Sequence, residues 1–149
     1  MFKSILVPID GTSLSYKPIS TAIEFAKLEN ANARLVMVSV AEPRMFNSVQ
    51  HDALHDAKEA EKLNVETAKE NIRKALASVN AAGIQWESVI SVSSTPCDAI
   101  LETAKRLQCD LILMATRGKM GIVDTFFNES TTQEVLRKTL IPVLVFPDT

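Results

Sequence analysis

The chain has 149 residues, of which 46% are hydrophobic and 23% charged, as in an ordinary globular protein. This length favours one domain over residues 1–149, with a core that buries roughly two thirds of the unfolded surface. The net charge of −2 argues against a nucleic-acid partner, which needs a clustered basic face. No apolar run approaches the ~20 residues of a membrane span, and no signal-peptide pattern is evident, so we expect a cytoplasmic protein without a membrane partner.

The first part of the chain predicts a strand, a helix and a second strand. Residues 3–9, KSILVPI, form a β-rich apolar run. The segment DGTS at residues 10–13 combines turn and N-cap chemistry, so a helix should follow it. Pro18 fits that helix only in its first turn, where its missing N–H group is not needed. Residues 34–40 predict the second strand, and residues 41–50 predict a loop.

The longest helix is predicted over residues 52–82, where apolar side chains recur every three or four positions. Its many charged residues predict a solvated face. Two exposed ion pairs are expected on that face, Glu66 with Lys69 and Glu70 with Lys74.

The remaining segments continue the alternation of strand and helix. Residues 84–92 predict a strand with one less buried face, and Pro96 begins a helix that runs to about residue 107. Residues 111–115 form an apolar run typical of a buried parallel strand. A helix over residues 132–138 and a strand over residues 143–146 follow. The order β-α-β-α-β-α-β-α-β predicts an α/β fold with an open five-stranded parallel sheet flanked by helices, Rossmann-like in class.

Ligands of such sheets bind beyond the carboxyl ends of the strands, where the strand order reverses. This rule selects residues 10–13, 40–43 and 115–132 as candidate binding segments. The last segment holds Gly118 and Gly121 between a strand and a helix that a Ser/Thr cluster opens. Such an arrangement places backbone N–H groups and a helix N-terminus around a phosphate.

The cysteines and histidines offer weaker candidate sites. Cys97 and Cys109 are too few for a disulfide framework, and reduced structural thiols are the simpler interpretation. The alternative is a reactive Cys97, because a helix start would lower the pKa of its thiol. His51 and His55 have the i, i+4 spacing of a zinc-binding pair, but no third ligand is evident, and two solvated histidines are the simpler interpretation.

Four separated motifs, ILVPIDGTSLS, VMVSVAEP, LILMATRG and LRKTLIPVLVF, resemble the universal stress protein family in the expected order. The resemblance covers essentially the whole chain. It implies a five-stranded parallel sheet flanked by helices, of the adenine nucleotide alpha hydrolase-like kind. It also implies a homodimer that pairs through the last strand, at Val143, Leu144, Val145 and Phe146.

One branch of this family binds ATP through a Gly-x2-Gly-x9-Gly-Ser/Thr motif, and this chain keeps the motif in part. The three glycine positions fall on Ala115, Gly118 and Asn128. Glu129 stands at the Ser/Thr position, where a carboxylate about 4 Å from a phosphate charge costs about 1 kcal/mol even in water. Alternatively, a shift of one residue places Glu129 and Ser130 at the last two positions of the motif, so that the loop is one residue longer. The altered loop therefore favours weak or absent nucleotide binding.

The resemblance also implies roles for residues at the strand ends. Asp10 matches the family carboxylate near the ribose and adenine, Pro8 a residue that lines the base pocket, and Val40 a residue whose backbone bonds to adenine. The candidate nucleotide-binding residues are Pro8, Asp10, Thr12, Val40, Met114, Ala115, Arg117, Gly118, Asn128, Ser130 and Thr131.

Two functional hypotheses follow. The first is a cytoplasmic universal stress protein that acts in the stress response by binding and regulation, with unidentified protein partners and weak or absent adenine-nucleotide binding. The second is an ATP- or AMP-binding switch or slow ATPase that uses residues 115–132, with Mg²⁺ if ATP is bound. No nucleophile–base pair is evident in the sequence, so catalysis is disfavoured.

Overall fold

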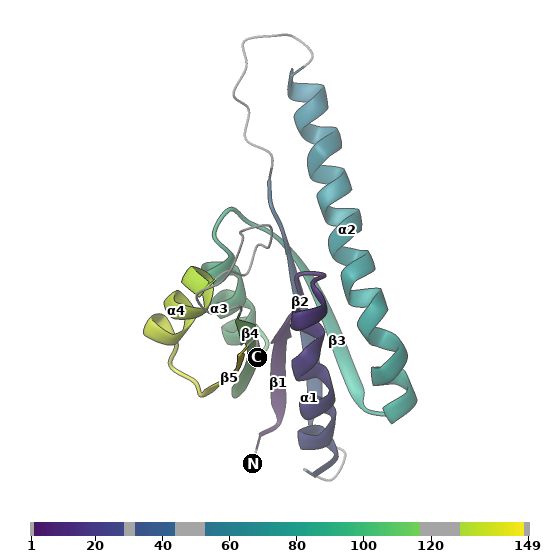
Figure 1. The fold of residues 1–149 in the computed structure, drawn as a ribbon, viewed down its shortest axis with the longest axis vertical. Coiled ribbons are helices and arrows are strands. Elements are labelled where there is room, and N and C mark those ends of the chain that lie inside the picture. Colours follow the sequence, from purple (N-terminus) through teal and green to yellow (C-terminus); the bar gives the residue numbers. More distant parts are fainter. Residues whose placement is uncertain (1, 29–31, 44–52, 117–128, 148–149) are drawn as a thin grey trace.

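The computed structural model describes residues 2–28, 32–43, 53–116 and 129–147, which form a central sheet with helices on both sides (Figure 1). All the strands are parallel, in the order β3-β2-β1-β4-β5. The strands are β1 (Ser4–Pro8), β2 (Arg34–Ala41), β3 (Gln85–Val92), β4 (Leu111–Thr116) and β5 (Val143–Pro147). The helices are the 3₁₀ turn η1 (Ser13–Tyr16), α1 (Lys17–Leu28), α2 (Ala53–Ala82), α3 (Pro96–Arg106) and α4 (Glu129–Lys138). The predicted α/β fold is confirmed.

The strand order reverses between β1 and β4. The chain adds β2 and β3 on one side of β1, then crosses to build β4 and β5 on the other side. Every residue of β1 is buried, whereas the edge strand β3 is largely half-buried or exposed. The less buried face predicted for residues 84–92 is confirmed, since β3 is an edge strand with only one neighbouring strand to cover it.

Two hydrophobic clusters hold the helices to the sheet. Alternate side chains of a strand point to opposite faces, so each apolar strand serves both clusters. Helices α1 and α2 cover one face, and α3 and α4 cover the other (Figure 1). The first cluster includes Ile5, Val7, Leu35, Met37, Ile19, Ala22, Ile72 and Val79, and the second includes Leu6, Val36, Val38, Ile112, Ile100, Ala104 and Val135.

Two helix starts differ from the prediction. The segment DGTS leads first into η1, where the Thr12 hydroxyl accepts a hydrogen bond from the Ser15 N–H (3.3 Å). Helix α1 then begins at Lys17, so Pro18 lies in its first turn, as predicted. Helix α4 begins at Glu129 rather than at residue 132. The Ser/Thr cluster at residues 130–132 therefore lies inside the first turn of the helix.

Helix α2 carries the predicted ion pairs in altered form. The Lys69 ammonium lies 3.5 Å from Glu66, which confirms the first pair. The second prediction is wrong, because Glu70 pairs with Arg73 through two hydrogen bonds of 2.7 Å. A guanidinium binds both carboxylate oxygens at once, which an ammonium cannot do, and this bonding lowers the pKa of Glu70. Lys74 is therefore left without a carboxylate partner among the described residues.

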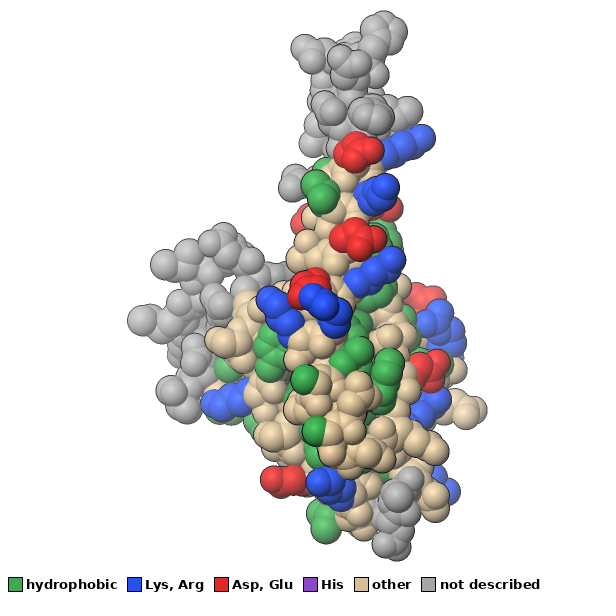
Figure 2. Space-filling view, turned by 90° about the vertical axis from the view of Figure 1, so that its right-hand side faces the viewer, with side chains coloured by type: hydrophobic (Ala, Val, Ile, Leu, Met, Phe, Trp, Pro, Cys, Tyr) green, Lys and Arg blue, Asp and Glu red, His purple; other side chains and the backbone are tan. Residues whose placement is uncertain are grey.

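The part of α2 that extends beyond the sheet is highly charged. Figure 2 turns the molecule so that this helix faces the viewer, and it shows acidic and basic side chains interspersed along the upper part of the helix. Among the described helices, none combines the length and the apolar character that a membrane span requires.

Both cysteines are buried and free, in agreement with reduced structural thiols. Burial raises the pKa of the Cys97 thiol more than the nearby Lys138 lowers it. The alternative of a lowered pKa at Cys97 is therefore wrong. Burial also raises the pKa of Cys109, whose sulfur lies 3.4 Å from the Ser4 hydroxyl.

Candidate functional site

A small cavity lies at the carboxyl ends of β1 and β4, where the strand order reverses. Its volume is about 10 Å³, room for about one water molecule between the described side chains. The structure thus brings together five predicted site residues at the switch point of the sheet. The lining residues are Pro8, Asp10, Thr12, Leu14, Ser15, Met114 and Ala115.

Pro8 explains why β1 and β4 separate here. The pairing of β1 with β2 continues to Pro8 and Val38, whereas its pairing with β4 is described only at Ile5 and Leu6. The Ile9 N–H donates to the Val38 carbonyl (2.8 Å). The backbone N–H and C=O groups at odd positions of this segment therefore point toward β2, and those at even positions point toward β4. Pro8 has no N–H to donate toward β4. The ladder therefore ends, and the cavity forms beside it.

The backbone of Val40 lies beyond the end of β1, on the side of β2. The Ala41 carbonyl accepts a hydrogen bond from the Ser93 N–H (3.0 Å). The backbone N–H and C=O groups of Ala41 therefore point toward β3, and those of Val40 point toward the side of β1. The register of β2 with β1 ends at Val38. Val40 thus presents its N–H and C=O groups beyond the end of β1, as backbone bonding to a base would require.

Asp10 holds the turn after β1 with one of its two carboxylate oxygens. Its Oδ1 accepts hydrogen bonds from the Thr12 N–H (3.0 Å) and the Thr12 hydroxyl (2.6 Å). The Ser15 hydroxyl accepts a bond from the Asp10 N–H (3.3 Å) and donates to the Thr12 carbonyl (2.8 Å). No hydrogen bond to Asp10 Oδ2 is found among the described residues. Asp10 is therefore a turn residue that still has one oxygen to offer a ligand.

The turn packs tightly against α2. Gly11 has a φ of +88°, and a Cβ atom built on it would lie 2.6 Å from Oδ1 of Asn71. Tyr16 donates a hydrogen bond from its hydroxyl to the Asn71 carbonyl (2.8 Å). Burial, and then the charges of Asp10 and Glu70, raise the pKa of Tyr16.

Helix α4 packs against β4 and begins at Glu129, where the last part of the family's ATP-binding motif falls. Thr131 is buried, and so is its neighbour Thr132, whose hydroxyl has no hydrogen-bond partner among the described residues. Ser130 lies in α4, although its side chain is not among those described. The candidates Arg117, Gly118 and Asn128 lie outside the described residues.

Sequence reasoning missed Leu14 and Ser15 as lining residues of the cavity. The available signal was the N-cap motif directly after Asp10, because a tight 3₁₀ turn brings the second and third residues after the cap, here Thr12, back toward it. The predicted histidine pair falls on His51, outside the described residues, and on His55, whose side chain is not described. In the described part of the chain, no three His, Cys, Asp or Glu side chains gather as a metal site would require.

Comparisons with known proteins agree with this architecture. Residues 1–147 match the model of the universal stress protein family. A universal stress protein of Thermus aquaticus is 32% identical over 147 residues, which cover 97% of this chain and 98% of the relative. The structure of universal stress protein UspA from Lactobacillus plantarum is similar with a TM-score of 0.77 and 22% identity, over 97% of both chains.

Several solved structures of similar fold hold adenine nucleotides. A universal stress protein in complex with cAMP has a TM-score of 0.67 and 24% identity, over 97% of both chains. A family member from Arabidopsis thaliana with AMP bound has a TM-score of 0.59 and 15% identity, over 99% of this chain and 92% of that chain. The protein from Archaeoglobus fulgidus in complex with dAMP has a TM-score of 0.57 and 19% identity, over 96% of both chains. From its sequence match and its fold, this chain belongs to the universal stress protein family.

Proposed function

We propose that this chain is a stress-response protein that binds an adenine nucleoside monophosphate weakly and reversibly, and that it acts by binding rather than by turnover. The observation that carries the proposal is the opening between β1 and β4, where Asp10 has one carboxylate oxygen available to a ligand. The backbone of Val40, beyond the end of β1 on the side of β2, offers a further contact. The cAMP, AMP and dAMP complexes of structurally similar proteins support the choice of ligand class.

The chemistry of the opening orients such a ligand. Buried Pro8 and Met114 offer apolar contact to a base, and the Val40 backbone offers one donor and one acceptor to its edge. The Asp10 carboxylate suits ribose hydroxyls, which donate hydrogen bonds, and it repels a phosphate. The phosphate is therefore expected on the side of α4, near the N-terminal end of that helix, where the helix dipole favours an anion.

Weak binding follows from the same residues. Ala115 carries a methyl group where the family motif has glycine, and this methyl limits how closely a ligand can approach the backbone. The cavity between the described side chains is also small, so a base must displace some of them to enter. We expect that displacement to reduce the affinity. The cytoplasmic location and the protein partners stay predictions from the sequence.

Isothermal titration calorimetry with AMP, cAMP and ATP–Mg²⁺ tests the proposal. The variants are Asp10→Ala, which removes the turn and ligand contacts, and Asp10→Asn, which keeps an acceptor for the turn but loses the charge. Both should weaken AMP binding about tenfold or more, as expected for the loss of hydrogen bonds to a charged group. The matched control is Asp98→Ala, which removes an exposed carboxylate of α3, 3.6 Å from Lys138, and should leave binding unchanged.

Three outcomes would contradict the proposal. Absence of binding heat with every nucleotide at millimolar concentration would exclude nucleotide binding as the function of this site. Wild-type affinity in Asp10→Asn, with loss only in Asp10→Ala, would leave Asp10 a turn residue. Steady phosphate release from ATP that Asp10→Asn abolishes would favour the slow ATPase instead.

A further inference from the structure

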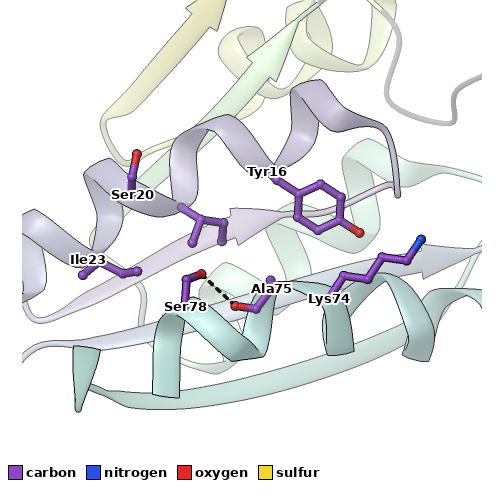
Figure 3. Close-up of a pocket in the computed structure, with 7 residues that line it drawn as sticks. Tyr16, Ser20, Ile23, Lys74, Ala75 and Ser78 are labelled. Carbon is purple, nitrogen blue, oxygen red and sulfur yellow. Dashed lines mark hydrogen bonds between the residues drawn. The ribbon is translucent and has the colours of Figure 1, made fainter. Parts of the chain in front are cut away.

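A larger cavity lies between α1 and α2, on the opposite face of the sheet from α3 and α4 (Figure 3). Its volume is about 390 Å³, within the range of small-molecule sites. The packed helices leave this space because small residues face one another, Ser20 on α1 and Ala75 and Ser78 on α2. Several of its lining side chains are exposed, so the space is a groove that opens to solvent between the two helices.

The groove is apolar along its length and carries a cation at one end. Ile19, Ile23 and Ala75 supply apolar walls. Figure 3 shows Lys74 and Tyr16 at one end of the groove and Ile23 at the other.

Lys74 has no carboxylate partner among the described residues, because Arg73 binds Glu70 through both carboxylate oxygens. The Tyr16 hydroxyl is already donated to the Asn71 carbonyl. No carboxylate of the described residues thus lies within ion-pair distance of the Lys74 ammonium, although the charge of Glu70 is near enough to interact with it.

We propose that this groove binds a medium-chain aliphatic carboxylate. The alkyl chain lies along Ile19, Ile23 and Ala75, and the carboxylate lies against the ammonium of Lys74. Both halves of the ligand follow from the lining, since burial of each CH₂ group is favourable and an anion complements the ammonium of Lys74, which has no carboxylate within ion-pair distance among the described residues. The site is separate from the strand-end opening, and the proposal goes beyond nucleotide binding.

Nuclear magnetic resonance of isoleucine δ1 methyl groups, during titration with sodium octanoate, tests the proposal. The Ile19 and Ile23 signals should shift in a saturable manner with octanoate. Octyltrimethylammonium, which has the same chain with the opposite charge, should bind more weakly. The Lys74→Met variant should weaken octanoate binding about two- to fivefold, the range for an exposed ion pair. The matched control, Lys69→Met, removes a lysine paired with Glu66 outside the groove and should leave binding unchanged.

A second pair of variants tests the shape of the groove. Ser20→Tyr places a ring in the groove from an exposed position of α1 and should abolish the octanoate shifts. Glu24→Tyr adds the same ring on α1 at an exposed position that does not line the groove, and it should keep them. Equal binding of the ammonium compound, equal losses in Lys69→Met and Lys74→Met, or persistence of the shifts in Ser20→Tyr would each overturn the proposal.

Discussion

Tyr16 connects the two cavities of the molecule. Its ring lines the groove between α1 and α2, and its hydroxyl bonds to the carbonyl of Asn71, whose side chain lies against Gly11 of the strand-end turn. The sequence predicts a turn at Gly11, because glycine readily adopts a positive φ. It could not predict the partner, since Asn71 is far away in the chain and meets Gly11 only through the packing of α2.

The ionisation of Tyr16 gives a prediction at the scale of a residue. Burial, then Asp10 and Glu70, raise its pKa, so in the folded protein it should ionise above the ordinary value of about 10. A raised folded pKa stabilises the native state below about pH 10, and this stability is lost as the pH rises through the folded value. The chain has a single tyrosine, so near-ultraviolet absorbance during alkaline titration reports Tyr16 alone.

Titration in urea and a Tyr16→Phe variant complete that experiment. In urea the transition should return to about pH 10. Tyr16→Phe should lack the absorbance change, and its free energy of unfolding should fall less steeply above about pH 10. Identical transitions with and without urea would contradict the raised pKa.

At the scale of elements, the sequence predicts what depends on local pattern. The apolar runs of β1 and β4 indicate buried central strands, and both are found as such. The start of α4 was misplaced because Ser and Thr are strong N-cap residues, and no local signal showed that Glu129 would begin the helix. The partner of Glu70 was also misassigned, since i+3 and i+4 cations both follow it and side-chain geometry decides between them.

The opening between β1 and β4 depends on a missing backbone donor, which the substitution Pro8→Val would restore. The valine amide introduced by this substitution should donate toward β4, lengthen the ladder and narrow the opening. Hydrogen exchange should show this new amide protected, and calorimetry should show weaker AMP binding. The control is Pro142→Val at an exposed position before β5, which should leave AMP binding unchanged. Rapid exchange of the introduced amide would show that Pro8 does not cause the separation.

At the scale of the whole molecule, neither cavity follows from the sequence alone. The residues at the ends of β1 and β4 were identified individually, but their meeting depends on the strand order, which the family resemblance implies and the pairing shows. The groove was not predicted. It depends on the distance between α1 and α2, and the small residues that line it carry no distinctive pattern in the sequence.

The strand order also leaves β5 at an edge of the sheet, and we propose that two copies of the chain pair there. The Ile112 N–H donates to the Pro142 carbonyl (3.0 Å). The backbone N–H and C=O groups at even positions of β5 therefore point toward β4, and those of Val143 and Val145 point outward from the edge of the sheet. Leu144 is 41% exposed and Leu140 is fully exposed, so apolar surface accompanies the unpaired edge. Antiparallel pairing about a two-fold axis would bury both features.

Proline substitution can separate this interface from the fold. Val145→Pro removes one outward N–H and places ring atoms at the edge, while the bonds from β4 to even positions of β5 stay available. The wild-type protein should sediment at about twice the chain mass of 16.4 kDa at micromolar concentration, and Val145→Pro near the mass of one chain. Ser88→Pro makes the same change at an outward position of the other edge strand, β3, and should keep the wild-type mass. Pairing through β5 requires that Val145→Pro be monomeric while Ser88→Pro stays dimeric. Equal dissociation of the two variants, or a monomeric wild-type protein, would exclude pairing through β5.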